Sequence, residues 1–496
     1  MFNQLFGKYF KISFIVFIII DVLSFFAYQD DCSHLIIFIV LTLLSLGLTL
    51  YKLELGLYIF LAELFIGSQG HLFSLATPYF GFSIRMSVFA IFFLVWLSKV
   101  IAGRRLDFFT KNNQFLYIYL LLFIAVAAGA LRGILNNPLN QTFFDFNGWL
   151  FLAIVPAVFS IVRSFKVIKN ILAILLSAVG FISLKTLVVL LLFAYKLPIN
   201  LSIFYNWLRD SRIGEITHVT GTFYRIFFQA QIYVLIGFLL CFFLLLMRQK
   251  LDLDKVTVKW LRVIMLFSST VLIACLSRSF WVGAVFALLF VFILLVWRHR
   301  FSLIKMVRLF VTMSLIVVVE IAFLFIITGN IPVSFTHNLI RDRLDDPTEE
   351  VAGMSRIAQL GPLWSAISQN WFWGSGFGKA VTYYTDDPRI LAKSPTGIYN
   401  TYAFEWGYLD IWLKLGLSGL LIYLYLYYLV FKKGIYLIRK KADSSIFIIA
   451  LLLGMAALLA TNMFSPYLNH PLGIGYLILL SAIINFSIKE YVVKTS

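Results

Sequence analysis

The sequence predicts an all-α integral membrane protein with about 12–14 transmembrane helices and one large structured loop outside the membrane. Over 496 residues the chain is 61% hydrophobic, 18% aromatic and only 13% charged, more apolar surface than a soluble fold of that length can bury. Apolar runs long enough to cross ~30 Å of hydrocarbon as helices recur as far as the C-terminus. These runs are continuous rather than alternating, which excludes a transmembrane β-barrel.

Hydropathy predicts fourteen spans, of which the third and ninth are short. The first run could be read as a signal peptide, but it contains Asp21, lacks a small-x-small cleavage site and precedes many further spans, so we expect a retained helix. The predicted spans are 11–28, 35–51, 55–69, 84–102, 115–132, 149–164, 171–195, 223–247, 261–277, 279–297, 306–328, 403–431, 446–464 and 471–487.

Loop charge predicts the orientation. With the N-terminus in the cytoplasm, the cytoplasmic segments carry 26 Lys and Arg against 6 Asp and Glu, whereas the outer segments carry 13 of each. This pattern obeys the positive-inside rule and predicts a multi-pass protein of the bacterial inner membrane with both termini in the cytoplasm. The formal net charge of +18 is therefore a signal of membrane orientation and does not predict a nucleic-acid partner.

The outer segments contain ten arginines and only three lysines. Lysine and arginine orient a membrane protein equally well, but only arginine offers a planar fork that matches phosphate or carboxylate. Either the composition has drifted, or the outer surface binds a phosphate-bearing ligand.

The outer loops hold most of the chain that lies outside the membrane. The longest, 329–402, contains an apolar-periodic stretch at 354–367 that predicts a surface helix, and 196–222 is the next longest. Long structured loops on one face commonly carry function. The sequence Gly374-Ser-Gly-Phe-Gly378-Lys379 is not a phosphate-binding P-loop, because the glycine spacing is wrong and Ala380 stands where Ser or Thr is needed.

Several outer arginines are candidates for ligand binding. Near the membrane surface each could form either a structural pair or a ligand contact, and Arg278 is the strongest ligand candidate because the loop at 277–279 is so short. Arg341 and Arg343 have acidic neighbours and predict local pairing instead. The arginines at the membrane surface are Arg85, Arg132, Arg225 and Arg278, and the loop arginines include Arg209, Arg212 and Arg356.

One outer carboxylate is a candidate general base. Glu405 precedes a predicted span, where it could accept a proton from an attacking sugar hydroxyl or simply favour a helix N-terminus. Among the histidines, which show no metal-ligand spacing, only His218 is a candidate for the site.

Charged residues inside the predicted spans require partners. Asp410 and Lys414 are spaced i, i+4 and predict a structural ion pair. Lys185 and Glu320 could pair with each other or belong to a proton or ion pathway.

Four segments between about 217 and 425, in this order around the long outer loop, resemble the O-antigen ligase/polymerase superfamily. They are His218-Val-Thr-Gly-Thr-Phe223, Leu276-Ser-Arg-Ser-Phe-Trp-Val-Gly283, Arg356…Trp364…Trp371-Phe-Trp-Gly-Ser-Gly-Phe-Gly378, and Tyr408-Leu409…Leu415-Gly416-Leu-Ser-Gly419. The resemblance implies a glycosyltransferase that takes a polyprenyl-diphosphate-linked glycan as donor and needs no metal or nucleotide cofactor. It also implies that Arg225 and Arg278, with Arg356 and Arg85 as further candidates, bind the diphosphate, and that Arg278 and Glu405 are catalytic.

The implied partners are the glycan donor, a glycan or lipid-linked acceptor and membrane lipids, with a flippase or a chain-length regulator as candidate partner proteins. Ligases of the superfamily carry a His where this chain has Glu405, and Trp406 replaces an Asn. This departure weakens the interpretation as a ligase to lipid A core. It favours a polymerase of O-antigen, capsule or exopolysaccharide repeats, or a ligase to another acceptor.

A lipid-linked oligosaccharide flippase and a proton-coupled transporter remain rival classes. The predicted organisation is an N-terminal transmembrane bundle at 1–216, a ligase-like core at 217–431 that includes the outer loop 329–402, and a C-terminal helix pair at 432–496.

Overall fold

The computed structural model describes residues 2–76, 81–103, 113–197, 200–299, 347–392, 394–440, 442 and 444–495, and a few positions between 315 and 328. It is 76% helical. Among the described residues, nine helices are long and apolar enough to cross a membrane, and three shorter apolar helices accompany them. The predicted all-α, multi-pass membrane fold is therefore confirmed.

Long apolar helices make up both halves of the chain. The first half contains η1 (Phe2–Gln4), α1 (Lys8–Ala27), α2 (Asp31–Tyr51), α3 (Leu53–Ile66), α4 (Ile84–Ile101), α5 (Gln114–Asn136), α6 (Leu139–Phe146), η2 (Asn147–Ile154), α7 (Val155–Ile161), α8 (Phe165–Ala194) and α9 (Leu201–Asp210). The second half contains α10 (Gln231–Leu246), α11 (Lys255–Ala274), α12 (Arg278–His299), α15 (Pro347–Gln369), α16 (Pro388–Leu391), α17 (Gly407–Arg439), α18 (Ser445–Thr461), η4 (Tyr467–Asn469) and α19 (Pro471–Thr495).

Three short antiparallel hairpins interrupt the helices. Their strands are β1 (Ser74–Ala76) with β2 (Gly81–Ser83), β3 (Gly214–Thr220) with β4 (Phe223–Phe228), and β5 (Val381–Tyr384) with β6 (Ile398–Thr401).

The helices differ in how much of their surface the protein buries. The apolar windows of α8 and α19 are 72% and 78% buried, whereas those of α1 and α2 are 22% and 17% buried. Since all four are apolar on every side, the first two form the core and the last two expose most of their surface to lipid. Capping side chains begin several helices: Ser83 accepts an amide hydrogen bond at α4, and Ser164 does so at α8.

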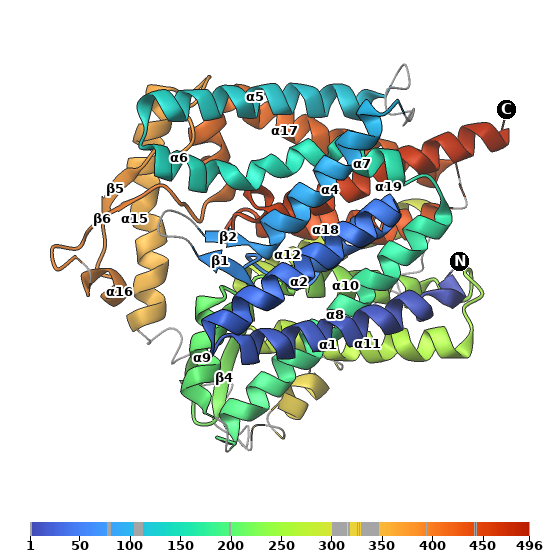
Figure 1. The fold of residues 1–496 in the computed structure, drawn as a ribbon, viewed down its shortest axis with the longest axis horizontal. Coiled ribbons are helices and arrows are strands. Elements are labelled where there is room, and N and C mark those ends of the chain that lie inside the picture. The colour runs from blue at the N-terminus through green and yellow to red at the C-terminus, as the bar shows by residue number, and fades with distance from the viewer. Residues whose placement is uncertain are drawn as a thin grey trace.

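The elements that the sequence predicts to lie on the outer side gather at one end of the molecule (Figure 1). In this view α5 runs beside α17, and α15, α16, β5 and β6 lie at the left-hand end, away from both termini. The two chain ends thus share the side opposite to these elements.

Three predicted spans need correction, and a fourth lies mostly outside the described residues. Residues 223–228 form β4 rather than the start of a span, and the helix begins only at Gln231. The span predicted at 149–164 consists of most of η2 followed by α7, with Pro156 near the start of α7, and the apolar helical segment begins earlier, with α6 at Leu139. The helix predicted at 403–431 begins at Gly407, is kinked at Gly416 and continues to Arg439. Most of the span predicted at 306–328 lies outside the described residues.

The outer loop is folded, as predicted, where the structure describes it. The surface helix expected at 354–367 is confirmed as part of α15. A small apolar cluster ties this helix to β5 and to the start of α17; its buried members are Leu363, Ala366, Ile367, Val381, Phe404 and Leu413. Residues 329–346, with Arg341 and Arg343, lie outside the described residues.

Candidate functional site

The β3–β4 hairpin positions Arg225. The alternation of buried and part-buried side chains along β4 turns Ile226 and Phe228 into the core and leaves Arg225 part-buried on the other face. The Nε of Arg225 donates to the carbonyl oxygen of Cys275 at 3.0 Å, and the guanidinium lies 5.3 Å from the Phe227 ring centre. This hydrogen bond fixes the strand against the end of α11.

The junction between α11 and α12 carries Arg278. Leu276 adopts a left-handed conformation (φ 49°), which is costly for a branched side chain and reverses the chain within two residues. Ser277 and Ser279 are buried and share a hydrogen bond of 3.1 Å, whereas Arg278 is exposed. The tight junction therefore holds the arginine at the end of both helices.

The turn 461–470 connects this junction to the start of α17. Ser465 donates to the Ser279 hydroxyl at 3.1 Å, and Thr461 donates to the Ser279 carbonyl at 3.2 Å. Next to Ser465, the Phe464 ring lies 5.8 Å from the ring of Trp406. The turn thus contacts both the arginine junction and the segment that carries Glu405.

Glu405 forms an ion pair with Arg356 of α15. Both side chains are about half exposed, at 48% and 47%. The indole N–H of the adjacent Trp406 donates to the Arg356 carbonyl at 2.9 Å, so the two segments are joined by backbone as well as by charge.

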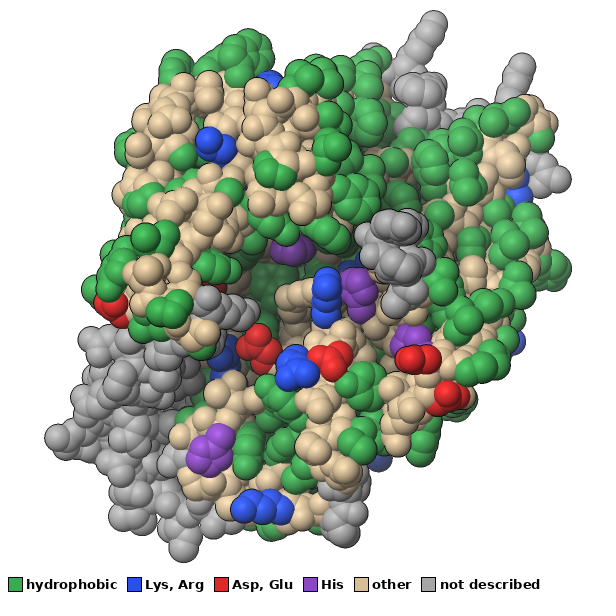
Figure 2. Space-filling model, turned by 60° about the vertical axis from the view of Figure 1, so that its left-hand side comes forward, with side chains coloured by type: hydrophobic (Ala, Val, Ile, Leu, Met, Phe, Trp, Pro, Cys, Tyr) green, Lys and Arg blue, Asp and Glu red, His purple; other side chains and the backbone are tan. Residues whose placement is uncertain are grey.

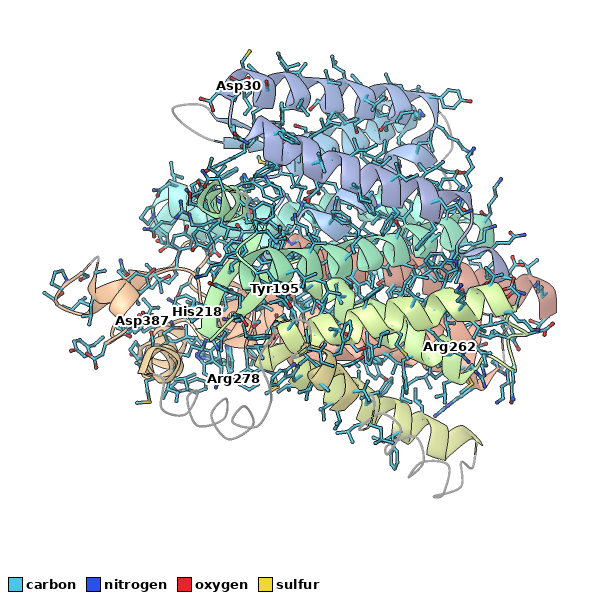
Figure 3. The ribbon with its side chains drawn as sticks, turned by 90° about the horizontal axis from the view of Figure 1, so that it is seen from below. Asp30, Tyr195, His218, Arg262, Arg278 and Asp387 are labelled. Carbon is cyan, nitrogen blue, oxygen red and sulfur yellow. The ribbon has the colours of Figure 1, made fainter. Side chains whose placement is uncertain are left out.

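These contacts link four of the predicted site residues into one set, here called the outer cluster: Arg225, Arg278, Arg356 and Glu405. Arg225 of β4 contacts Cys275, three residues before Arg278, and the turn 461–470 contacts Ser279, the residue after Arg278. The same turn contacts Trp406, the residue after Glu405, and Trp406 in turn contacts Arg356 of α15. Figure 2 shows this end of the molecule hollowed, with basic, acidic and histidine side chains around the hollow and hydrophobic side chains within it. In Figure 3, Arg278 and His218 lie at one end of the helices and Arg262 at the other.

Arg85 has a different setting. It is 5% exposed, and its Nε pairs with Glu63 at 2.8 Å while its Nη1 donates to the Ser68 carbonyl at 2.8 Å. The structure therefore commits two of the three guanidinium nitrogens to the protein itself.

His218 lies on the exposed side of β3. One ring nitrogen is 2.9 Å from the Gly221 carbonyl oxygen, and the ring contacts Tyr224 edge to face. Both partners belong to the same hairpin, so His218 stabilises the turn that leads into the strand of Arg225.

The glycine loop, residues 374–378, packs closely against neighbouring helices and does not form a phosphate-binding loop. Gly374, Gly376 and Gly378 have φ values of 79°, 82° and 76°, a region in which a side chain is strained. A Cβ on Gly376 would lie 2.5 Å from the amide nitrogen of Gly133 in α5, and one on Gly374 would lie 2.3 Å from that of Gly416.

The amide groups of this loop are already used. Ser375 and Gly376 donate to the carbonyls of Leu413 and Lys414 at 2.7 and 3.1 Å, at the point where α17 is kinked. Gly378 donates to the Asp145 carboxylate at 2.8 Å. The loop therefore fastens the outer segment to α5, α6 and the kink of α17.

A buried charged network lies behind the glycine loop. Lys414, 4% exposed, pairs with Asp410 at 2.5 Å, as the spacing predicts, and also with Asp145. Asn469 donates to the second oxygen of Asp410 at 2.5 Å. The network joins α6, α17 and the turn 461–470, and it supports the backbone beside Glu405.

Two outer histidines that the sequence did not single out lie near these charges. The protein around His470, with the positive charges of Lys414 and Arg85, lowers the pKa of its ring, although the residue is partly accessible to solvent. Burial, with Arg212 and Arg85, lowers the pKa of His71 to about 4. Both rings are therefore neutral at neutral pH, and no sequence spacing pointed to either one.

Lys185 and Glu320, the other charged residues considered inside the spans, do not pair with each other. Lys185 pairs with Asp21 at 2.5 Å and lies 4.6 Å from the Trp207 ring centre, and Glu320 accepts from Ser269. The predicted Lys185–Glu320 pair is therefore wrong. Arg132 donates to the Gly374 carbonyl at 3.3 Å, which places it on the glycine loop.

Residues 263–424 match the family model of O-antigen ligases. No curated protein and no solved structure matches the chain significantly. The matched segment contains Arg278, Arg356 and Glu405, the glycine loop and the kink of α17. The match confirms the resemblance to the O-antigen ligase/polymerase superfamily.

Proposed function

We propose, from the O-antigen ligase domain that residues 263–424 carry, that this multi-pass membrane protein polymerises lipid-linked polysaccharide repeats at the outer face of the bacterial inner membrane. The family supports glycan transfer of the ligase/polymerase type. The polyprenyl-diphosphate donor, the polymerase reaction, the outer face and the residue roles are part of the proposal.

The observation that carries the proposal is the outer cluster. Three arginines and one carboxylate from β4, the α11–α12 junction, α15 and the start of α17 are linked through the turn 461–470. Transfer from a diphosphate without a metal requires cations at the leaving group and a base at the attacking hydroxyl. The cluster supplies both residue types at one end of the helix bundle.

In the proposed reaction, the hydroxyl oxygen of the acceptor sugar attacks the anomeric carbon of the donor glycan. The bond between that carbon and the diphosphate oxygen breaks, and the polyprenyl diphosphate leaves with the electron pair. Arg278 and Arg225, with Arg356, bind the diphosphate and stabilise its added negative charge. Glu405 accepts the proton of the attacking hydroxyl.

The Arg356–Glu405 pair connects the two halves of this chemistry. Because both side chains are about half exposed, the pair can open toward a ligand at little cost. A diphosphate that takes Arg356 would release the carboxylate for the acceptor. Arg85, committed to Glu63 and Ser68, is assigned to supporting the site rather than to the ligand.

The polymerase proposal rests on Glu405, which stands where ligases of the superfamily have a histidine. Transfer to lipid A core or to another acceptor is the alternative, and the family model that matches is named for ligases. The two reactions differ only in the acceptor, so a defined acceptor decides between them.

The test is reconstitution of the purified protein in lipid with one defined polyprenyl-diphosphate oligosaccharide, followed by gel analysis. A ladder of multiples is expected from the donor alone. Arg278→Ala is expected to lower the rate about 100- to 1,000-fold, the loss typical of one group that stabilises a developing negative charge. Glu405→Gln is expected to lower it about 100-fold or more, since the base is lost.

The matched control is Arg209→Ala, which removes an exposed outer arginine that pairs with its neighbour Asp210. This variant is expected to keep the ladder. Single transfers that appear only with a separate acceptor would identify a ligase. Movement of the lipid between leaflets without any transfer would contradict the proposal and identify a flippase.

A further inference from the structure

A second charged hollow lies at the other end of the bundle, between the end of α10 and the start of α11. Its volume is about 530 Å³. The basic side chains that line it are Arg248, Lys255, Lys259 and Arg262, against the single carboxylate of Asp252. We call these five residues, together with the apolar Leu253, Val258 and Val263 that also line it, the basic pocket.

Three of the four cations share one face of α11. Lys255, Lys259 and Arg262 are spaced i, i+4 and i+7, so they form one stripe over two helical turns, and Arg248 faces them from the end of α10. All four side chains are exposed. Arg262 lies about 10 Å along the helix from Lys255, so the stripe reaches from the aqueous end into the first part of a membrane span.

None of these four cations forms an ion pair within the described part of the chain. Other basic residues at this end have partners. Lys169 donates to Gln4 at 2.7 Å, Lys494 pairs with Glu490 at 3.6 Å, and Lys433 lies 5.6 Å from the Phe115 ring centre. Four cations that converge around a single carboxylate, with which none of them forms an ion pair, leave an excess of positive charge that indicates an anionic ligand.

The apolar surroundings indicate that this ligand is a lipid. Val258 and Val263 line the same pocket, and Trp260 is 43% exposed and lies 6.1 Å from the ring of Phe6. Aromatic and apolar side chains beside basic ones are typical of the layer in which lipid headgroups lie. A free phosphate would use the cations but not the apolar wall.

We propose that the basic pocket binds the phosphate headgroup of an anionic membrane lipid, on the face opposite to the outer cluster. The positive-inside pattern predicts that this face is cytoplasmic. That rule requires basic residues near the membrane but does not require them to form a pocket, and the convergence of Arg248 with the α11 stripe goes beyond it. The proposal is independent of the reaction at the outer cluster.

The test is native mass spectrometry of delipidated protein in a nonionic detergent, titrated with dioleoyl phosphatidylglycerol. Dioleoyl phosphatidylcholine and inorganic phosphate are titrated in parallel. The wild-type protein is expected to retain phosphatidylglycerol in preference to phosphatidylcholine. Lys259→Gln with Arg262→Gln is expected to weaken phosphatidylglycerol binding roughly 25-fold, since each basic side chain near a lipid surface contributes about a fivefold gain.

The matched control is Lys432→Gln with Lys440→Gln, which removes the same charge from the end of α17 that lies on the same predicted face. Retained binding in this control supports a site, whereas an equal loss in both double variants overturns it in favour of general surface attraction. Competition by millimolar inorganic phosphate as effective as that by the lipid would also overturn it, in favour of a free-anion site. If the double variant does not fold, Lys259→Gln and Arg262→Gln are each expected to cause about a fivefold loss.

Discussion

Two arginine–glutamate pairs, Arg85–Glu63 and Arg356–Glu405, have the same chemistry and opposite degrees of burial. In the Arg85–Glu63 pair the side chains are 6% and 10% exposed and the nitrogen–oxygen distance is 2.8 Å. In the Arg356–Glu405 pair they are 47% and 48% exposed. Breaking a buried pair leaves an uncompensated charge out of water, whereas an exposed pair is worth little because solvent replaces either partner.

We expect burial, rather than residue type, to separate a supporting arginine from a ligand-binding one. Both arginines lie in segments that the sequence predicts to be on the outer side of the membrane, and the sequence makes both candidates for binding the diphosphate. Only Arg356 has a partner that it can exchange for a ligand at small cost.

The largest loss of stability is expected at the buried Arg85–Glu63 pair. Arg85→Met removes the positive charge and leaves the Glu63 carboxylate buried without its partner, so the free energy of unfolding is expected to fall by about 3–5 kcal/mol. Thermal unfolding of the purified protein in detergent measures this loss. Adding Glu63→Gln to the same chain is expected to restore part of it, because the remaining buried group is then neutral.

Arg209→Met is the control, since this arginine is 55% exposed and pairs with its sequence neighbour Asp210. Its unfolding temperature is expected to stay close to that of the wild type. If the Arg85→Met protein has the unfolding temperature of the wild type but no longer binds the donor, Arg85 binds the diphosphate, and burial does not distinguish the two arginines.

An intermediate loss of stability is expected at the glycine loop. This loop attaches the segment between Arg356 and Glu405 to the helix bundle. Gly376→Ala forces a side chain into a backbone with φ 82° and places a Cβ 2.5 Å from a backbone nitrogen of α5. Strain and close contact together are expected to cost about 1–3 kcal/mol, seen as a lower unfolding temperature. Because the loop supports α17 at its kink, transfer activity is expected to fall as well.

Gly361→Ala is the matched control for this variant. It adds the same methyl group to the helix α15, where no atom lies within 4 Å of the new Cβ apart from the adjoining residues and the nearby backbone of the same helix. Normal activity and stability in Gly376→Ala would show that the loop is not rigid.

The sequence predicts the features of this molecule that depend on local pattern. The apolar runs predict the helices because lipid demands continuous hydrophobicity, and the i, i+4 spacing predicts the Asp410–Lys414 pair. The span predicted at 223–247 begins too early, because the aromatic strand β4 is as hydrophobic as a transmembrane helix. Periodicity alone does not identify β4 next to a real span.

Partners distant in sequence could not be predicted in this way. Asp145 and Lys414 are 269 residues apart, and Arg85 and Glu63 are 22 apart, so no periodic pattern joins them. Asp145 was a lone acid among phenylalanines, a signal that could have marked it as buried and paired. The resemblance indicated Arg225, Arg278, Arg356 and Glu405, whereas their linkage through the turn 461–470 required the structure.

The smallest effect on stability is expected at the exposed Arg356–Glu405 pair. Arg356→Ala is expected to change the free energy of unfolding by less than about 1 kcal/mol, because both side chains are near half exposed. A double-mutant cycle with Glu405→Gln measures the coupling in unfolding and in glycan transfer separately. Near-zero coupling in unfolding together with a clear loss of transfer in each single variant is the signature of a pair kept for a ligand. A coupling in unfolding as large as that of Arg85 with Glu63 would instead make Arg356 and Glu405 a second structural pair, and would leave the proposed reaction without its base.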